Sequence, residues 1–225
     1  MKKPLAFALV LVVSFAAGYF ARGLISRPQA ADQPSSYWTE KKSFFDVLGA
    51  YASTVMIGDS LTDGAEWKEM FPGVAVANRG IDEDTTAGVL RRMDGIMSAR
   101  ARKAFIMIGI NDFKEGRTVD AVFQDYASIV SALEKGGMKV FVQSTLLCNE
   151  AKGEWISCSA IQRKIRELNR RLAGLASAKV TYIDINAGLT GPEGLRPDLT
   201  FDGVHLNGEG YRIWRDEISK FVLAE

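Results

Sequence analysis

Short apolar runs alternate along this chain with longer stretches of helical period, and this alternation restricts the fold more than any other feature. Nearly continuous apolar runs are typical of buried parallel strands, and strands that alternate with helices indicate a parallel sheet covered on both faces. We therefore expect an α/β fold with five parallel strands. The predicted strands are Thr54 to Ile57, Val74 to Ala77, Ala104 to Ile108, Val140 to Ser144 and Val180 to Ile185, and the predicted helices are 87–99, 119–135, 160–176 and 208–223.

Residues 1–21 differ in character from the rest of the chain. Lys2 and Lys3 precede a largely apolar, uncharged run from Leu5 to Ala21. The run fits a signal peptide or an N-terminal membrane anchor; it is slightly short for a spanning helix, and no clear cleavage site follows it. Both alternatives stay open. In either case we expect export to the periplasm or beyond, with a tether in the inner membrane as one outcome.

Residues 22–37 are expected to form a polar linker, and residues 38–225 a single domain that contains the whole predicted sheet. Without the four basic residues of the first 31 positions, 24 basic residues stand against 27 acidic ones. A mildly acidic domain has no electrostatic footprint for nucleic acid. The basic clusters at 91–92, 100–103 and 163–171 are interpreted as solvated helix faces.

Cys148 and Cys158 are the only cysteines, and they are close enough in sequence to close a small loop in an oxidising compartment. We expect a disulfide between them. Two unpaired buried thiols are the alternative, because pairing depends on a Cα separation that the sequence does not give. A zinc site is not expected from two cysteines and one histidine.

The residues that can carry chemistry follow the predicted strands, because open α/β sheets bind ligands beyond the carboxyl ends of their strands. Ser60 follows the first strand, Gly80 the second and Asn111 the third. The amide of Ser60, the amide of Gly80 and the side chain of Asn111 could together form an oxyanion hole. Taken singly, each is explained equally well as a turn residue.

His205 is the only histidine in the chain, and it precedes the last predicted helix. A serine nucleophile needs a base within hydrogen-bond reach, and that base is most often histidine. Asp202 lies in the same loop and could orient the imidazole. The pattern predicts a catalytic triad of Ser60, His205 and Asp202.

Four blocks of sequence, IGDSLTDG, NRGI, IGIND and DGVHLNGEGY, resemble in order the signature blocks of the SGNH hydrolase superfamily, the GDSL esterases. The resemblance implies a flavodoxin-like three-layer α/β/α sandwich, the triad above, and oxyanion donors at Ser60, Gly80 and Asn111. The stretch that begins at NRGI is similar to relatives of platelet-activating-factor acetylhydrolase and sialate O-acetylesterase. In those relatives the two residues after NRGI are usually glycines, whereas this chain has Asp82 and Glu83.

The expected activity is hydrolysis of short-chain acyl esters, most of all O-acetyl groups on envelope or extracellular glycans, through an acyl-enzyme. Acyl transfer through a serine requires no cofactor, and none is expected. No metal is expected either, because the carboxylates at 59, 63, 82, 83 and 84 are scattered over loops, where they are usually solvated. Two alternatives remain: an O-acyltransferase of the same fold, and a catalytically silent glycan-binding protein. The expected substrate is a small-molecule or glycan ester.

Overall fold

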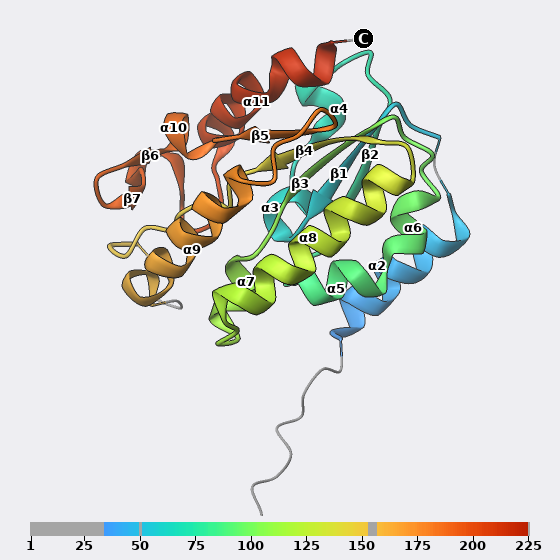
Figure 1. The fold of residues 1–225 in the computed structure, drawn as a ribbon. Helices are drawn as coiled ribbons and strands as arrows, with labels where there is room; N and C mark the ends of the chain where they lie inside the picture. Colours follow the sequence, from blue (N-terminus) through green and yellow to red (C-terminus); the bar gives the residue numbers. More distant parts are fainter. Residues whose placement is uncertain (1–33, 50, 153–156, 225) are drawn as a thin grey trace, which may run out of the picture. The chain divides into compact units, whose positions relative to one another are not determined.

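The computed structural model describes residues 34–49, 51–152 and 157–224. Its centre is a parallel sheet with the strand order β2-β1-β3-β4-β5 (Figure 1). The strands are β1 Thr54–Gly58, β2 Val76–Gly80, β3 Lys103–Met107, β4 Lys139–Gln143 and β5 Val180–Ile183. Every neighbouring pair is parallel. The predicted five-stranded parallel sheet is confirmed.

Alternate residues of the strands point to opposite faces of the sheet, and each face is covered by helices. On one face, strand residues such as Val55 and Ile57 pack with α5 Thr86–Arg91, α6 Met93–Met97, α8 Val119–Lys135 and α9 Cys158–Ala173. On the other face, Met56 and Phe105 pack with α3 Ser60–Asp63, α4 Trp67–Met70, α10 Asn186–Leu189 and α11 Gly208–Leu223. This is the three-layer α/β/α arrangement that the family resemblance implies.

The predicted helix bounds hold best where the apolar period is longest. Helices α8 and α11 match their predicted ranges, and α9 begins and ends a few residues earlier than predicted. The helix predicted at 87–99 is wrong, because Arg92 leaves the helical conformation and divides it into α5 and α6. Strand β2 begins two residues later than predicted and includes Gly80.

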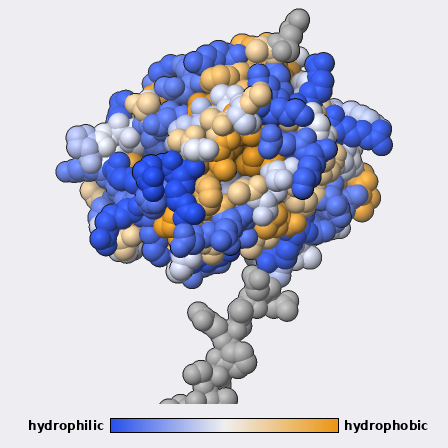
Figure 2. Space-filling view, viewed as in Figure 1, coloured by the Kyte–Doolittle hydropathy of each residue, from blue (hydrophilic) through white to orange (hydrophobic). Residues whose placement is uncertain are grey.

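Short elements carry no full period and were not predicted. They are α3, α4, α10, α7 Ile110–Lys114, the hairpin of β6 Thr190–Gly191 and β7 Gly194–Leu195, and the 3-10 turn Pro197–Leu199. Helix α2, Ser36–Val47, begins inside the segment that was predicted as linker. In the same view as the ribbon, the surface is mainly hydrophilic with separate hydrophobic patches (Figure 2).

Residues 36–225 form one compact unit. The sheet, both large hydrophobic clusters and the disulfide belong to it, so this unit holds a complete core of the kind a domain needs to fold alone. The predicted signal or anchor at 1–21 and residues 22–33 of the predicted linker lie outside the described residues. Within the described ranges, no helix combines the length and apolar character needed to cross a bilayer.

Cys148 and Cys158 are joined by a disulfide, with a Cα separation of 5.8 Å. Both side chains are fully buried, Cys148 after β4 and Cys158 at the start of α9. The bridge therefore holds the first turn of α9 against the segment that leaves the sheet.

Replacing both cysteines by serine should lower the free energy of unfolding by about 3 kcal/mol, the loop-closure effect expected for so short a loop. Urea denaturation of residues 34–225 would measure the change. The unsubstituted domain kept in a reducing agent is the matched control and should lose about the same amount. Equal stability of all three forms would show that the bridge contributes nothing.

Candidate active site

Ser60 lies at the point where β1 ends and α3 begins. Asp59 caps α3 by accepting a hydrogen bond from the Leu61 amide at 3.1 Å. Gly58 allows this tight turn, since a Cβ there would lie 2.2 Å from the Thr62 hydroxyl and 2.4 Å from the Met107 carbonyl oxygen. The strand and the turn thus place the Ser60 hydroxyl at the carboxyl edge of the sheet.

The three residues predicted as a triad form one hydrogen-bonded chain. The Ser60 hydroxyl lies 2.9 Å from His205 Nε2, and His205 Nδ1 lies 2.6 Å from Asp202 Oδ2. Because an ionised carboxylate only accepts hydrogen bonds, we assign the imidazole proton to Nδ1, which leaves Nε2 to accept the serine proton. The geometry is that of a hydroxyl prepared for deprotonation.

The loop that carries Asp202 and His205 is held by its own backbone. Asp202 Oδ1 accepts hydrogen bonds from the amides of Val204 and His205, at 2.9 and 2.8 Å. The Thr200 hydroxyl closes the loop by donating to the His205 carbonyl oxygen at 2.7 Å. Partial burial raises the pKa of Asp202, but the hydrogen bonds from the His205 ring and from the two amides outweigh it, so its pKa lies below the ordinary value. Asp202 therefore stays ionised at neutral pH, opposite the imidazole.

Gly80 does not offer its amide to the site as predicted. That amide donates to Asn78 Oδ1 at 2.9 Å, while Asn78 Nδ2 donates to the Asp63 carbonyl oxygen. A Cβ on Gly80 would lie 2.2 Å from the Asp63 amide nitrogen. The residue is glycine because β2 packs directly against the backbone of α3, and its contribution to the site is to position the helix that begins with Ser60.

The loop after β2 contains two backbone amides that remain without a hydrogen-bond acceptor among the described residues. The amides of Asp82 and Glu83 donate no hydrogen bond within the described part of the chain. Glu83 has a φ of 60°, the left-handed conformation that glycine adopts most readily. The turn from Ile81 to Asp84 therefore keeps, with a glutamate, a shape that favours glycine at this position. Asn111 lies against the same loop, because its Nδ2 donates to the Asp84 carbonyl oxygen at 3.0 Å.

A buried ion pair between Arg92 and Asp84 holds the loop after β2 in place. Arg92 Nε lies 2.7 Å from Asp84 Oδ2, and both side chains are only 1% exposed. Arg92 Nη2 also donates to the Gly58 carbonyl oxygen, and Trp38 Nε1 donates to Asp84 Oδ1 at 2.8 Å. The interpretation of residues 91–92 as a solvated face is therefore wrong for Arg92. Its guanidinium joins the loop after β2 to the end of β1, two residues before Ser60.

Asp59 is fully buried beneath the nucleophile. Its Oδ2 has no hydrogen-bond partner among the described residues. Burial, together with the charges of Asp84 and Asp112, raises its pKa from 3.8 to about 7, although the hydrogen bond from the Leu61 amide opposes the shift. Its place in the turn agrees with a structural role.

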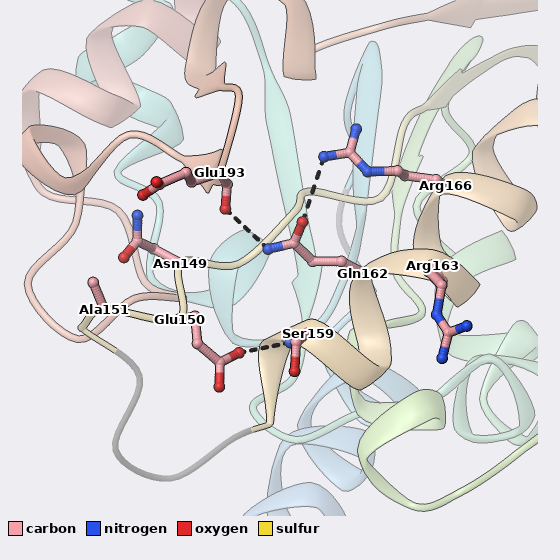
Figure 3. A pocket seen from close by; sticks show the side chains of 8 residues that line it. All are labelled: Asn149, Glu150, Ala151, Ser159, Gln162, Arg163, Arg166 and Glu193. Atoms are coloured by element: carbon pink, nitrogen blue, oxygen red, sulfur yellow. Dashed lines mark hydrogen bonds between the residues drawn. The ribbon is translucent and has the colours of Figure 1, made fainter.

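Two features that the sequence analysis did not identify border the site. Phe201 is 69% exposed, and its ring stacks on the His205 imidazole with centroids 6.1 Å apart. The second is a pocket of about 480 Å³ between the segment after β4 and helix α9 (Figure 3). One of its lining residues is Asn149, whose backbone amide donates a hydrogen bond to the Gly203 carbonyl oxygen in the loop that carries Asp202 and His205. Phe201 is notable only because its aromatic ring is exposed beside His205, and a sequence does not show which side chains are exposed.

The residues that line the pocket are mainly polar or charged, but most of the surface that they turn toward it is apolar. Gln162 is held at its centre by hydrogen bonds from Nε2 to the carbonyl oxygens of Cys148 and Glu193. Other lining side chains include Glu150, whose carboxylate accepts from the Ser159 amide, and Arg166 (Figure 3). Across the described ranges, no group of three or more potential ligand side chains could hold a metal ion.

Residues 56–213 match the GDSL-like lipase/acylhydrolase family. A GDSL-like lipase from Bacteroides thetaiotaomicron superimposes with a TM-score of 0.71 at 25% identity, over 83% of this chain and 97% of that one. A catalytic variant of the acetylxylan esterase of Geobacillus stearothermophilus superimposes with a TM-score of 0.60 at 19% identity, over 79% and 97%. The N-acylneuraminate cytidylyltransferase of Streptococcus agalactiae is 23% identical over 81% of this chain, which spans only 41% of that relative's length.

The raised pKa of Asp59 predicts how stability changes with pH. Since the folded protein keeps this carboxyl protonated where the unfolded chain ionises it, stability should fall as the pH rises from about 4 to about 7, by up to roughly 4 kcal/mol. Asp59→Asn removes the ionisation. The difference in unfolding free energy between variant and parent should therefore shift in favour of the variant over this range, as denaturant titrations at several pH values would measure. A difference independent of pH would contradict the shift.

Proposed function

Since the chain belongs to the GDSL-like lipase/acylhydrolase family and is a carboxylic ester hydrolase, we propose that it works as a serine esterase with Ser60 as nucleophile, His205 as base and Asp202 as the acid that orients it. The hydrogen-bonded chain from the Ser60 hydroxyl through the imidazole to the carboxylate carries this proposal. Such a chain is what activation of a weak hydroxyl nucleophile requires.

The proposed reaction proceeds in two steps. Ser60 Oγ attacks the ester carbonyl carbon while its proton passes to His205 Nε2, and the tetrahedral intermediate collapses as the imidazolium protonates the leaving alcohol. Water then attacks the acyl-enzyme and gives a proton to the same nitrogen. The second tetrahedral intermediate collapses as the imidazolium returns this proton to Ser60 Oγ, which releases the carboxylic acid and free Ser60. Asp202 stabilises the imidazolium throughout and remains ionised. No step needs a cofactor.

The oxyanion hole is proposed to consist of the Ser60 amide, the Asn111 side-chain amide and the amide of Glu83. Asn111 Nδ2 carries two hydrogens, of which one is used by the Asp84 carbonyl oxygen and the other is available to a substrate. The Glu83 amide has no partner among the described residues, and its left-handed backbone supports a functional constraint on this turn. This set replaces Gly80, whose amide is already bound.

Short acyl groups, above all O-acetyl groups on envelope or extracellular glycans, are the proposed substrates. Phe201 offers an exposed aromatic face beside His205 on which a sugar ring could stack. The similarity of fold to an acetylxylan esterase supports the same class. The expected export of the domain would bring it to such glycans.

The first experiment compares hydrolysis of p-nitrophenyl esters with acyl chains of two to eight carbons by the parent domain, Ser60→Ala and His205→Ala. Both variants should lose at least about 10³-fold in kcat without loss of folded structure, because each removes one part of the activated hydroxyl. Activity should be highest for acetate. Substantial turnover by Ser60→Ala would exclude the proposed nucleophile.

An acetylated xylan and an unacetylated glycan acceptor should then be added to the parent domain. Release of free acetate supports a hydrolase, and acetyl transfer to the acceptor would favour the acyltransferase. Binding of glycan without turnover of any ester would favour the catalytically silent protein.

The oxyanion hole has its own test. Asn111→Ala should lower kcat by about 10²- to 10³-fold with little change in KM, because the donor acts on charge that develops in the transition state. Glu83→Gly is the matched control: it keeps the backbone amide, should retain activity, and should raise the free energy of unfolding by about 1 kcal/mol as left-handed strain is released. Loss of activity in the glycine variant would mean that the Glu83 side chain, not its amide, serves the site.

A further inference from the structure

One side of α2 and its continuation exposes large apolar side chains. Phe44, Val47, Leu48 and Tyr51 are 60%, 76%, 56% and 79% exposed. Val47 and Leu48 lie three and four residues after Phe44, which places these three side chains on one helical face. The face ends at Leu48, whose amide still bonds to the Phe44 carbonyl oxygen, and Tyr51 follows beyond the helix. In Figure 2 hydrophobic side chains gather at the right-hand margin, where α2 ends in Figure 1. Apolar surface of this kind marks an interaction site more often than chance exposure.

This apolar face adjoins the amino-terminal edge of the sheet. The Ala52 amide bonds to the Ala99 carbonyl oxygen, just before β3, and the Arg100 guanidinium lies 5.1 Å from the centre of the Tyr51 ring. The end of α11 reaches the same edge, because Lys103 Nζ donates to the carbonyl oxygens of Phe221 and Val222.

The rest of the same edge is basic. The segments 98–103, 134–139 and 174–180, which lead into β3, β4 and β5, hold six lysines and arginines and one acidic residue, Glu134. The basic residues are Arg100, Arg102, Lys103, Lys135, Lys139 and Lys179, all of them exposed except the partly buried Lys103. Burial, with the nearby charges of Arg102 and Lys139, lowers the pKa of Lys103, which agrees with a concentration of positive charge here.

We propose that this edge, formed by the exposed face of α2 and the three basic segments, docks onto the surface of an anionic lipid bilayer. Apolar side chains would enter the interface between head groups and acyl chains, and the lysines and arginines would lie at the level of the anionic head groups. A second copy of the chain fits less well, because pairing this edge with itself would bring its excess of positive charge together.

The expected membrane segment at 5–21 supports the choice of a bilayer. Residues 22–35 can extend to about 48 Å, whereas α2, with 12 residues, is only about 18 Å long. A tether in the membrane would therefore leave the edge free to reach the lipid. Docking through this edge would direct the carboxyl edge, with Ser60 and His205, away from the bilayer and toward glycans beyond it.

The test is co-sedimentation of residues 34–225 with vesicles of phosphatidylcholine containing 30% phosphatidylglycerol, or of phosphatidylcholine alone. We expect binding to the anionic vesicles to be at least tenfold tighter. Arg100→Glu with Arg102→Glu, and separately Phe44→Ser with Leu48→Ser, should each weaken it at least tenfold. The control Arg212→Glu with Arg215→Glu makes the same change of net charge on α11 and should bind like the parent.

Arg100→Glu with Arg102→Glu, and Phe44→Ser with Leu48→Ser, should hydrolyse p-nitrophenyl acetate at the rate of the parent domain. Unchanged rates would show that both double variants fold. Ser60→Ala should bind vesicles like the parent, so the docking test is independent of the proposed catalysis. Equal binding to both vesicle types, or no effect of either edge variant, would overturn the proposal. A concentration-dependent dimer that Phe44→Ser with Leu48→Ser abolishes would instead identify the edge as an interface between copies of the chain.

Discussion

The buried ion pair between Arg92 and Asp84 is the interaction on which the site depends. It joins four separate parts of the chain: Trp38 of α2, the loop after β2, the break between α5 and α6, and the carbonyl oxygen of Gly58. Charges removed from water cost several kcal/mol each unless they are paired, so neither partner can leave without a large loss of stability. The pair therefore fixes the loop of Asp82 and Glu83 in relation to the turn that holds the nucleophile.

Close backbone packing on the other side of the turn also positions Ser60. Gly58 and Gly80 are neighbours in register on β1 and β2, and any side chain at either position would collide with α3. Asn78 then bonds to both the Gly80 amide and the Asp63 carbonyl oxygen. Short contacts between backbone elements thus position Ser60 more rigidly than its own four-residue helix could, which is a requirement for a nucleophile that must meet a base from a distant loop.

The fold and the core of the site could be predicted because they depend on local pattern. Apolar runs and helical period identified the strands and the longer helices, and the only histidine left no other candidate base. The predictions failed where a residue's surroundings come from distant parts of the chain. The sequence context of Arg92 indicates a solvated side chain, but the structure buries it. The sequence also predicts that the Gly80 amide belongs to the oxyanion hole, whereas this amide donates a hydrogen bond to Asn78 Oδ1. Phe201 carries no pattern at all, since only its exposure beside His205 makes it notable.

The sequence by itself determined the order of strands and helices along the chain, the candidates Ser60, Asp202 and His205, and the two cysteines able to form a bridge. These follow from local periodicity and from the scarcity of suitable residue types. Only the tertiary structure decided that the Gly80 amide is bound by Asn78, that Glu83 adopts the backbone shape that favours glycine, and that one edge combines apolar and basic side chains. The physical reason is that hydrogen-bond partners, burial and shared surfaces are set by packing between segments far apart in sequence, which no local pattern records.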